Sequence, residues 1–227
     1  MAGMRTLLAA STLAFAALSS TAHAQEAAET TVVPPVSTVL NGQINLNSVI
    51  SDVRVTYDDG SGVDAVSAAF ANDFTAVTRG STLDLTSSQT NEAETTATTS
   101  ITTDEVDGFV GGAAIAISNK LTAGSNFAGS TVAIDQTTNA ATTARTDLTV
   151  SDGWGLNSGS SVAIANSATV GAAGFGNPAP LQATSTQTNN AAVRATSTLA
   201  TDNTNHAAFS HLSATAIGNT ATFGADF

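Results

Sequence analysis

The chain has 227 residues and a formal net charge of −12, with 6 basic residues against 18 acidic ones. So few cations exclude the basic patch that binding to nucleic acid requires. The chain contains no cysteine, which excludes disulfide bonds and thiolate chemistry. Aromatic residues make up 5% of the chain, fewer than a globular core of this length normally uses, so the composition favours a thin, extended architecture.

Residues 1–24 have the three parts of a secretory signal peptide. One positive charge, at Arg5, precedes the apolar stretch LLAASTLAFAAL, and the small-residue sequence AHA ends at Ala24. The apolar stretch is shorter than the roughly 18 to 20 residues that span a bilayer. We therefore expect cleavage before Gln25, no transmembrane segment after signal removal, and a secreted protein on the outer-membrane surface of a Gram-negative cell.

Two motifs recur along the rest of the chain. A glutamine with an asparagine two or three residues later returns at intervals of 46, 47 and 51 residues, and phrases such as AAIAISN follow in the same phase. Motifs that stay in phase over four copies predict four tandem repeats, at 43–88, 89–135, 136–186 and 187–227. Residues 25–42, which contain VVPPVSTV, are expected to form an irregular lead-in.

The spacing varies slightly between copies. In the third copy the asparagine comes one residue late, and the shift passes on to Asp152, which predicts a one-residue insertion inside a turn. The longest interval contains GFGNPAPLQ, whose two prolines cannot donate hydrogen bonds to a neighbouring strand. We expect an excursion of the chain there.

The repeats have the pattern of β-strands. In the second motif Ile115, Ile117 and Asn119 fall on one face, and residues of the other face alternate with them. Threonine, valine and isoleucine dominate the remainder, and glycine-rich clusters separate the runs. We predict an all-β repeat β-solenoid of stacked strand–turn–strand rungs. Because about 47 residues is long for one rung, two rungs of about 23 residues in each repeat are expected.

The recurring amides predict a structural ladder. Stacked repeats bring like amides to about 4.8 Å, or twice that distance if two kinds of rung alternate, so that each amide donates and accepts along the stack. A buried amide group left unpaired would cost about 1 to 3 kcal/mol. The predicted ladder residues are Gln43, Asn45, Gln89, Asn91, Gln136, Asn139, Gln187 and Asn189 from the first motif, with Asn72, Asn119, Asn166 and Asn219 from the second.

The sequence offers little for catalysis. His206 and His211 are the histidines that remain after signal removal, and no serine or aspartate lies at the spacing of a catalytic triad. We therefore expect no enzyme, no catalytic residue, no cofactor and no metal ligand. The acidic turns YDDGSGVD and TDEVDGF leave a calcium-binding alternative open, although aspartate and glycine are also ordinary turn residues.

Two resemblances bear on function. The phrase SSQTNEAETTATTSI resembles curlin repeats of secreted amyloid subunits, but the curlin unit is about half as long and its closing glutamine is absent here. Over residues 40–227, the alternation of QTN-x-A phrases with phrases such as SATAIGNTATFG resembles the holdfast anchor proteins of stalked alphaproteobacteria, of the HfaD type. That resemblance implies a secreted outer-surface protein that helps fix an adhesive polysaccharide to the cell envelope.

Two classes of function remain open. The first is a structural and adhesive rod whose partners are polysaccharide, other envelope or adhesion proteins, or its own copies, because the ends of such a stack are unpaired strand edges. A curli-like amyloid fibre subunit is a variant of it. The second is a calcium-dependent or catalytic secreted passenger domain that uses Asp58, Asp104 and Asp107.

Overall fold

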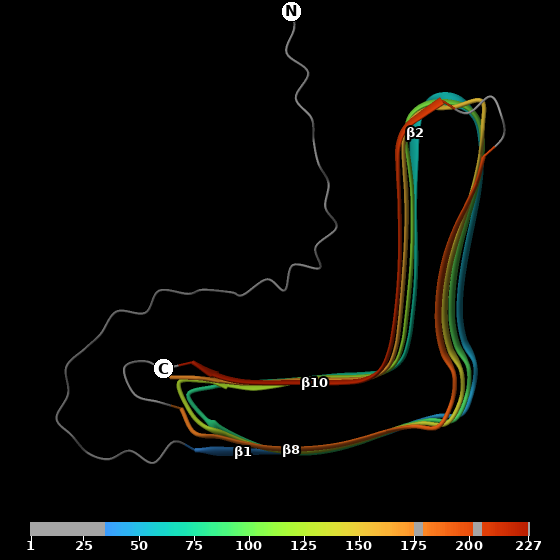
Figure 1. Cartoon of the computed structure of the whole chain (residues 1–227). Helices are drawn as coiled ribbons and strands as arrows, with labels where there is room; N and C mark the ends of the chain where they lie inside the picture. The colour runs from blue at the N-terminus through green and yellow to red at the C-terminus, as the bar shows by residue number, and fades with distance from the viewer. Residues whose placement is uncertain (1–34, 175–178, 202–205, 227) are drawn as a thin grey trace, which may run out of the picture. The chain divides into compact units, whose positions relative to one another are not determined.

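The computed structural model describes residues 35–174, 179–201 and 206–226. All the regular elements in these ranges are β-strands (Figure 1). No helix within them is long and apolar enough to cross a membrane. The predicted signal peptide, residues 1–24, lies outside the described ranges.

The strands follow one another with short connections. In chain order they are β1 (Val36–Asn45), β2 (Val49–Arg79), β3 (Thr82–Asn91), β4 (Thr95–Asn126), β5 (Ser130–Thr138), β6 (Thr142–Ser151), β7 (Trp154–Ala173), β8 (Leu181–Asn189), β9 (Val193–Thr201) and β10 (His206–Asp226). The all-β prediction is confirmed. Threonine and valine, which are frequent here, favour the extended backbone because their branched side chains pack well on a pleated surface.

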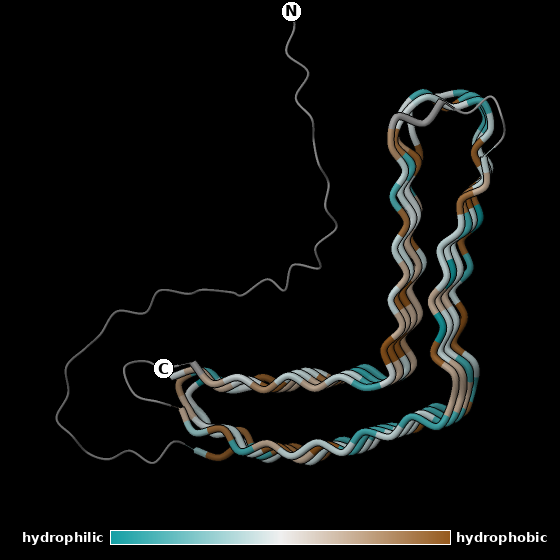
Figure 2. The backbone as a smooth tube through the Cα atoms, viewed as in Figure 1, coloured by the Kyte–Doolittle hydropathy of each residue, from teal (hydrophilic) through white to brown (hydrophobic). Residues whose placement is uncertain are grey.

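All the pairings between these strands are parallel and join segments far apart in sequence. One sheet has the order β1-β3-β5-β8, and the other has the order β10-β7-β4-β6-β9 with β2 on β4. Like segments therefore lie side by side along the stack (Figure 1), and residues of similar hydropathy lie next to one another over much of it (Figure 2). We call these segments the first to fourth layers: residues 36–79, 82–126, 130–173 and 181–226.

Each repeat contributes one layer and not two. Gln89 is the direct register partner of Gln43 on one side and of Gln136 on the other. No rung that carries the second motif lies between them, so the prediction of two alternating rungs is wrong. The physical reason is that one layer contains both motifs on facing walls: the Gln89 side chain reaches the carbonyl oxygen of Lys120, which follows the second motif.

The register corrects two further predictions. Gln89 pairs with Gln136 and Thr95 pairs with Thr142, so the spacing is unchanged through the turn between them and the predicted insertion there is wrong. The predicted lead-in is wrong from Val36 onward, because β1 is a regular strand whose Val36 pairs with Thr82.

The longest repeat interval has the predicted cause. Asn126 pairs with Ala173, and Ser130 pairs with Leu181, so the extra residues lie between β7 and β8. This is the segment that contains the two prolines, of which residues 175–178 lie outside the described ranges. Confining the insertion to a connection leaves the strand register intact on both sides.

The core between facing walls is narrow. One of its three clusters within the described ranges consists of alanines such as Ala97, Ala116 and Ala163, each with no exposed surface, and the other two contain leucine, isoleucine and valine. Hydroxyl groups reach across this thin core: Thr99 donates to the carbonyl oxygen of Ala113 at 2.6 Å, and Thr146 donates to that of Ser160 at 2.7 Å. These two hydroxyls are thereby paired, as burial requires, and they join the facing walls beside the alanine cluster.

Candidate functional site

Four glutamine side chains form one column across the layers. From the fourth layer to the second, the Nε2 donates to the Oε1 of the glutamine in the preceding layer at 2.7 Å: Gln187 to Gln136, Gln136 to Gln89, and Gln89 to Gln43. Each Nε2 also donates to a backbone carbonyl on the facing wall at 2.9 to 3.2 Å, the acceptors being Asp73, Lys120, Ser167 and Thr220. The two middle glutamines are fully buried with both donors and the acceptor in use.

Four asparagine side chains form a second column beside the first. From the first layer to the third, the Nδ2 donates to the Oδ1 of the asparagine in the following layer at 2.7 or 2.8 Å: Asn72 to Asn119, Asn119 to Asn166, and Asn166 to Asn219. The first three also donate to carbonyl oxygens in the next layer of the four-stranded sheet, those of Thr90, Thr137 and Thr188, at 2.8 or 2.9 Å. This column therefore links adjacent layers and both sheets.

The two columns run in opposite directions. Glutamine amides donate toward the N-terminal layers, whereas asparagine amides donate toward the C-terminal layers. The columns are adjacent, because the backbone acceptor of each glutamine is the residue that follows the asparagine: Gln136, for example, bonds Ser167 next to Asn166. A stack built this way has a defined polarity, with different groups left at its two ends.

The asparagines of the first motif do not make a continuous column. Asn45 donates to the Oδ1 of Asn91 at 2.7 Å. In the third layer, however, the register partner of both Asn91 and Asn189 is Thr138. A threonine side chain thus stands in this column between the second and the fourth layers.

Asn139 lies one residue farther on, in the turn. There it donates to the Oε1 of Glu92 at 2.7 Å and accepts from the Nδ2 of Asn190 at 2.8 Å, on the surface. The prediction that grouped Asn139 with Asn91 and Asn189 is wrong, because the chain keeps its register through the turn and adds no residue there.

The acidic turns have a backbone explanation. Asp59, Glu105 and Asp152 precede the same corner of successive layers, with φ of 57°, 53° and 47°. Aspartate is among the residues that enter this left-handed region most readily. At Gly155, where φ is 148°, a Cβ would lie 1.7 Å from the carbonyl oxygen of Gly108. Contact between the second and third layers therefore requires glycine at position 155, whereas the fourth layer has Ala207 in register there, next to a register shift.

The carboxylates of the calcium alternative lie on the surface of this corner. Asp58 and Asp104 are register partners and both are exposed, whereas Asp107 pairs with Trp154 after the turn. The described ranges contain no group of three or more histidine, cysteine, aspartate or glutamate side chains placed to hold a metal ion. His211 is exposed beside Ser158, and the side chain of His206 lies outside the described part.

Ion pairs occur at the surface of the layers. Lys120 lies 3.2 Å from the Oδ2 of Asp73 and 5.5 Å from the centre of the Phe70 ring, so it joins the first two layers. A hydrogen bond and the charge of Asp52, 3.0 Å away, raise the pKa of Arg54. Exposed pairs of this kind contribute about 0 to 1 kcal/mol, so they do not account for the stability of the stack.

The outer face of the first layer differs from that of the others. Leu40, Ile44 and Ile50 are 80%, 69% and 69% exposed. In the next three layers the same outer columns carry mainly threonine, namely Thr86, Thr90, Thr96, Thr137, Thr143, Thr184 and Thr188. Exposed apolar side chains gathered in one layer indicate a surface that contacts another molecule.

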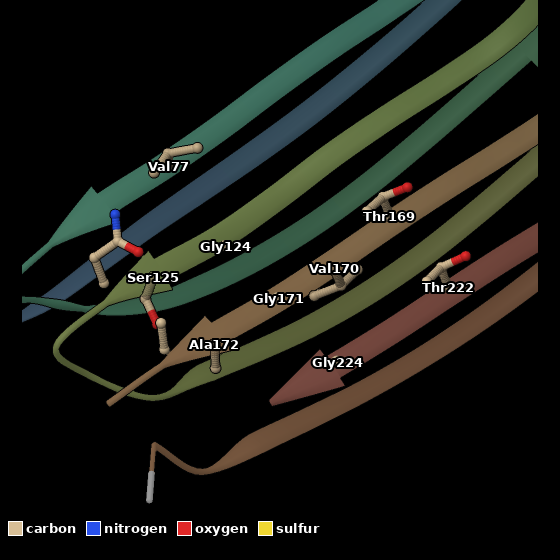
Figure 3. A pocket seen from close by; sticks show the side chains of 11 residues that line it. Val77, Gly124, Ser125, Thr169, Val170, Gly171, Ala172, Thr222 and Gly224 are labelled. Carbon is tan, nitrogen blue, oxygen red and sulfur yellow. The ribbon is translucent and has the colours of Figure 1, made fainter. Parts of the chain in front are cut away.

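A shallow groove of about 370 Å³ crosses the outer face of β4, β7 and β10 (Figure 3). Gly124, Gly171 and Gly224 are register partners and form its floor. Thr169 on β7 and Thr222 on β10 each lie two residues before the glycine of the same strand, and the two threonines are register partners. A Cβ on Gly171 would have no described neighbour closer than 3.9 Å, so the floor is open to solvent.

Sequence reasoning missed this groove and the apolar first layer. A usable signal existed for the groove: the phrases TAG, TVG and TFG end at Gly124, Gly171 and Gly224, and the first layer has TAV at the same place, ending at Val77. The apolar first layer could have been found by comparing the four repeats column by column in a fixed register.

A family model described as HfaD, holdfast attachment protein D, matches residues 56–226. The matched range takes in the second, third and fourth layers and most of β2. The search of curated proteins and the search of solved structures each gave no match.

Proposed function

The chain belongs to the holdfast attachment protein D family, and from that premise we propose that it is a structural and adhesive protein that helps anchor holdfast polysaccharide to the outer envelope. It acts as a β-solenoid in which four repeats of about 47 residues each supply one turn. Attachment requires a stiff body with several binding faces, and no catalytic step is part of this role.

The paired amide columns are the observation that supports the proposal most strongly. Each middle amide is buried and fully hydrogen-bonded, so a shift of register would leave donors and acceptors unpaired at about 1 to 3 kcal/mol each. The stack therefore holds one register without disulfides. A protein that links a polysaccharide to a cell carries load, and such interlayer bonds oppose the separation of layers.

The outer faces support two kinds of contact. The hydroxyls of Thr169 and Thr222, on adjacent strands about 4.8 Å apart in the groove, suit the hydroxyls of a polysaccharide chain, and several weak contacts add up to firm retention. The apolar outer side chains of the first layer, such as Leu40 and Ile44, suit an envelope or adhesion protein. On this view one protein joins polysaccharide to envelope.

Secretion to the cell surface is part of the proposal. Its support is the signal-peptide pattern of residues 1–24 and the family's role in attachment. Self-association of the secreted chain would multiply the number of polysaccharide contacts.

The proposal is tested by deleting the gene and measuring both cell retention on a surface and the holdfast left behind. We expect cells of the deletion strain to detach and leave holdfast on the surface, and we expect the native gene to restore retention. A matched pair of variants sharpens the assay: Gln136→Met breaks the glutamine column, whereas Gln182→Met lies on the outer face. Retention by the deletion strain equal to that of its parent would refute the proposal.

A further inference from the structure

We propose that copies of this chain stack end to end, with the first layer of one copy resting on the fourth layer of the next in the register that joins layers within a chain. This inference deepens the self-association in the proposed function and rests on it for its biological purpose. Its physical basis is independent of the polysaccharide, since it lies in the two ends of the stack.

The amide columns end in complementary groups. In the first layer, within the described part, the second Nε2 hydrogen of Gln43 and the Oδ1 of Asn72 have no partner. In the fourth layer the same holds for the Oε1 of Gln187 and the second Nδ2 hydrogen of Asn219. Stacking lets Gln43 donate to Gln187 and lets Asn219 donate to Asn72, which continues both columns across the junction.

The opposed directions of the columns select head-to-tail stacking. Two first layers would each present a donor in the glutamine column and an acceptor in the asparagine column, so their like columns could not pair. A first layer on a fourth layer pairs donor with acceptor in both columns. A contact between two different surfaces of the same chain does not close on itself unless a rotation closes it, so it generates an open filament.

The inner side chains of the two ends also complement each other in size. One inner column begins with Phe74 and passes through Leu121 and Ala168 to Ala221. The next inner column begins with Ala76 and passes through Ala123 and Val170 to Phe223. Stacking would therefore set Phe74 on Ala221 and Phe223 on Ala76, a large side chain on a small one in both columns.

The last layer exposes side chains that its neighbours bury. Phe223 is 44% exposed, whereas Val170 in the same column is 1% exposed. Leu212 is 42% exposed and follows Gly159, Gly112 and Ala65 in its column, so the first layer offers it another small residue. The end of the stack is an inner surface left open, and a first layer has the shape to cover it.

The end strands supply the backbone part of the contact. Within the described part, β1 pairs with β3 alone and β2 with β4 alone, while β8, β9 and β10 each pair along one edge. Long unpaired edges are templates for pairing with another chain. Successive layers keep one register over most of their described length, with shifts at Gly60/Gly62 and Ala207/Phe209, so a second copy can pair with most of these edges in a single register.

The test uses two variants that each spoil one end. Gln43→Glu keeps the acceptor for Gln89 but turns an oxygen toward Gln187, and Asn219→Asp keeps the acceptor for Asn166 but removes the donor to Asn72. The purified full chain, analysed by sedimentation velocity from about 1 to 100 μM, is expected to form a concentration-dependent series of oligomers. Each variant alone should associate at least about 10-fold more weakly, because every junction contains the altered group.

Mixing the two variants gives the decisive result. The intact fourth layer of Gln43→Glu fits the intact first layer of Asn219→Asp, so the mixture should form heterodimers and nothing longer. Gln182→Glu adds the same charge on the outer face and should assemble like the native chain.

Three results would overturn the inference: a native chain that stays monomeric at 100 μM, variants that assemble like the native chain, or a mixture without heterodimers. None of these measurements involves holdfast. A strain that keeps its attachment when the gene is deleted would count against the proposed function alone, and the stacking result would stand.

Discussion

The Nε2 of Gln136 donates to the Oε1 of Gln89 at 2.7 Å, and neither side chain has exposed surface. The two residues lie 47 positions apart and are direct register partners. A buried amide that bonds its own counterpart in the next layer stabilises one register over all others, because any slip separates like from like. The 47 residues from Gln89 to Gln136 are therefore one complete passage of the chain through a layer.

Removing a middle amide should be costly. Gln136→Met keeps the volume but leaves the Nε2 of Gln187, the Oε1 of Gln89 and the carbonyl oxygen of Ser167 without their partner. We expect the free energy of unfolding to fall by about 3 kcal/mol, measured by urea denaturation. The exposed Gln182→Met control should stay within about 0.5 kcal/mol of the native chain. Equal losses in both variants would mean that the column does not stabilise the fold.

The asparagine column predicts a pH effect. In Asn166→Asp the ionised carboxylate cannot donate to Asn219 or to the carbonyl oxygen of Thr188, and burial disfavours its charge. The pKa of the introduced carboxyl is therefore raised in the folded chain above the ordinary value of about 3.9. The folded state favours the protonated form. The deficit in unfolding free energy of Asn166→Asp relative to the native chain is therefore largest at a pH above the folded pKa.

That deficit should shrink as the pH falls from the folded pKa toward about 4, because in this range the folded chain binds the proton more readily than the unfolded chain does. Urea unfolding of Asn166→Asp and the native chain at pH 4 and pH 7 checks this, with the difference between the two proteins as the readout. Asn47→Asp, at an exposed turn, serves as the control and should show no such change. A deficit that is larger at pH 4 than at pH 7 would contradict the directed donation inferred for this column.

Glycine at the layer corner is predicted to be indispensable. Gly155→Ala would place a Cβ 1.7 Å from the carbonyl oxygen of Gly108 at a φ of 148°. We expect a loss of about 2 to 4 kcal/mol in unfolding free energy, since backbone of two layers must move apart. Gly42→Ala is the matched control, with nothing within 4 Å of its Cβ, and should be neutral or stabilising by up to about 1 kcal/mol. Similar melting temperatures for the two variants would contradict the corner geometry.

Larger side chains in the groove should weaken binding to the polysaccharide without destabilising the fold. Gly171→Val combined with Gly224→Val adds side chains where the nearest described atom is 3.9 Å or more away, and the first layer already carries Val77 in this column. We expect the melting temperature to be kept and the retention of the protein on purified holdfast polysaccharide to fall several-fold, since the altered positions line two of the stacked layers. Gly42→Val, on the outer face of β1, should bind like the native chain. Unchanged binding by the double variant would remove the groove from the proposed function.

The all-β class could be predicted because alternation in phrases such as AAIAISN and the frequency of threonine and valine point to strands whatever their partners. The spacing of the glutamines also equals the separation of register partners in the structure. The number of layers in each repeat could not be obtained this way. The repeat period predicts which residues stack on one another, but it does not determine whether one repeat forms a single layer or two.

The errors at Asn139 and at the lead-in have a common source. Both followed a recognisable residue type, an asparagine near a glutamine or a pair of prolines, and neither followed the register. Thr138 can replace an amide in its column because its hydroxyl finds a partner on the facing wall, where it donates to the Oδ1 of Asn166 at 2.9 Å. The complementary groups at the open ends depend on which residues face each other across layers, so they appear only in the folded arrangement.

The central claim is that each repeat forms one layer, and a pair of engineered cysteines tests it. The chain has no cysteine, so the pair Thr86→Cys and Ala133→Cys reports on one distance only. These positions are register partners, and adjacent strands about 4.8 Å apart fall within the 4.4 to 6.8 Å between Cα atoms that a disulfide bridges. The control pair, Thr86→Cys and Thr184→Cys, lies two layers apart at about 9.6 Å. Under mild oxidation, mass spectrometry should show an intramolecular disulfide in the first pair and free thiols in the second, whereas free thiols in the first pair would contradict the account.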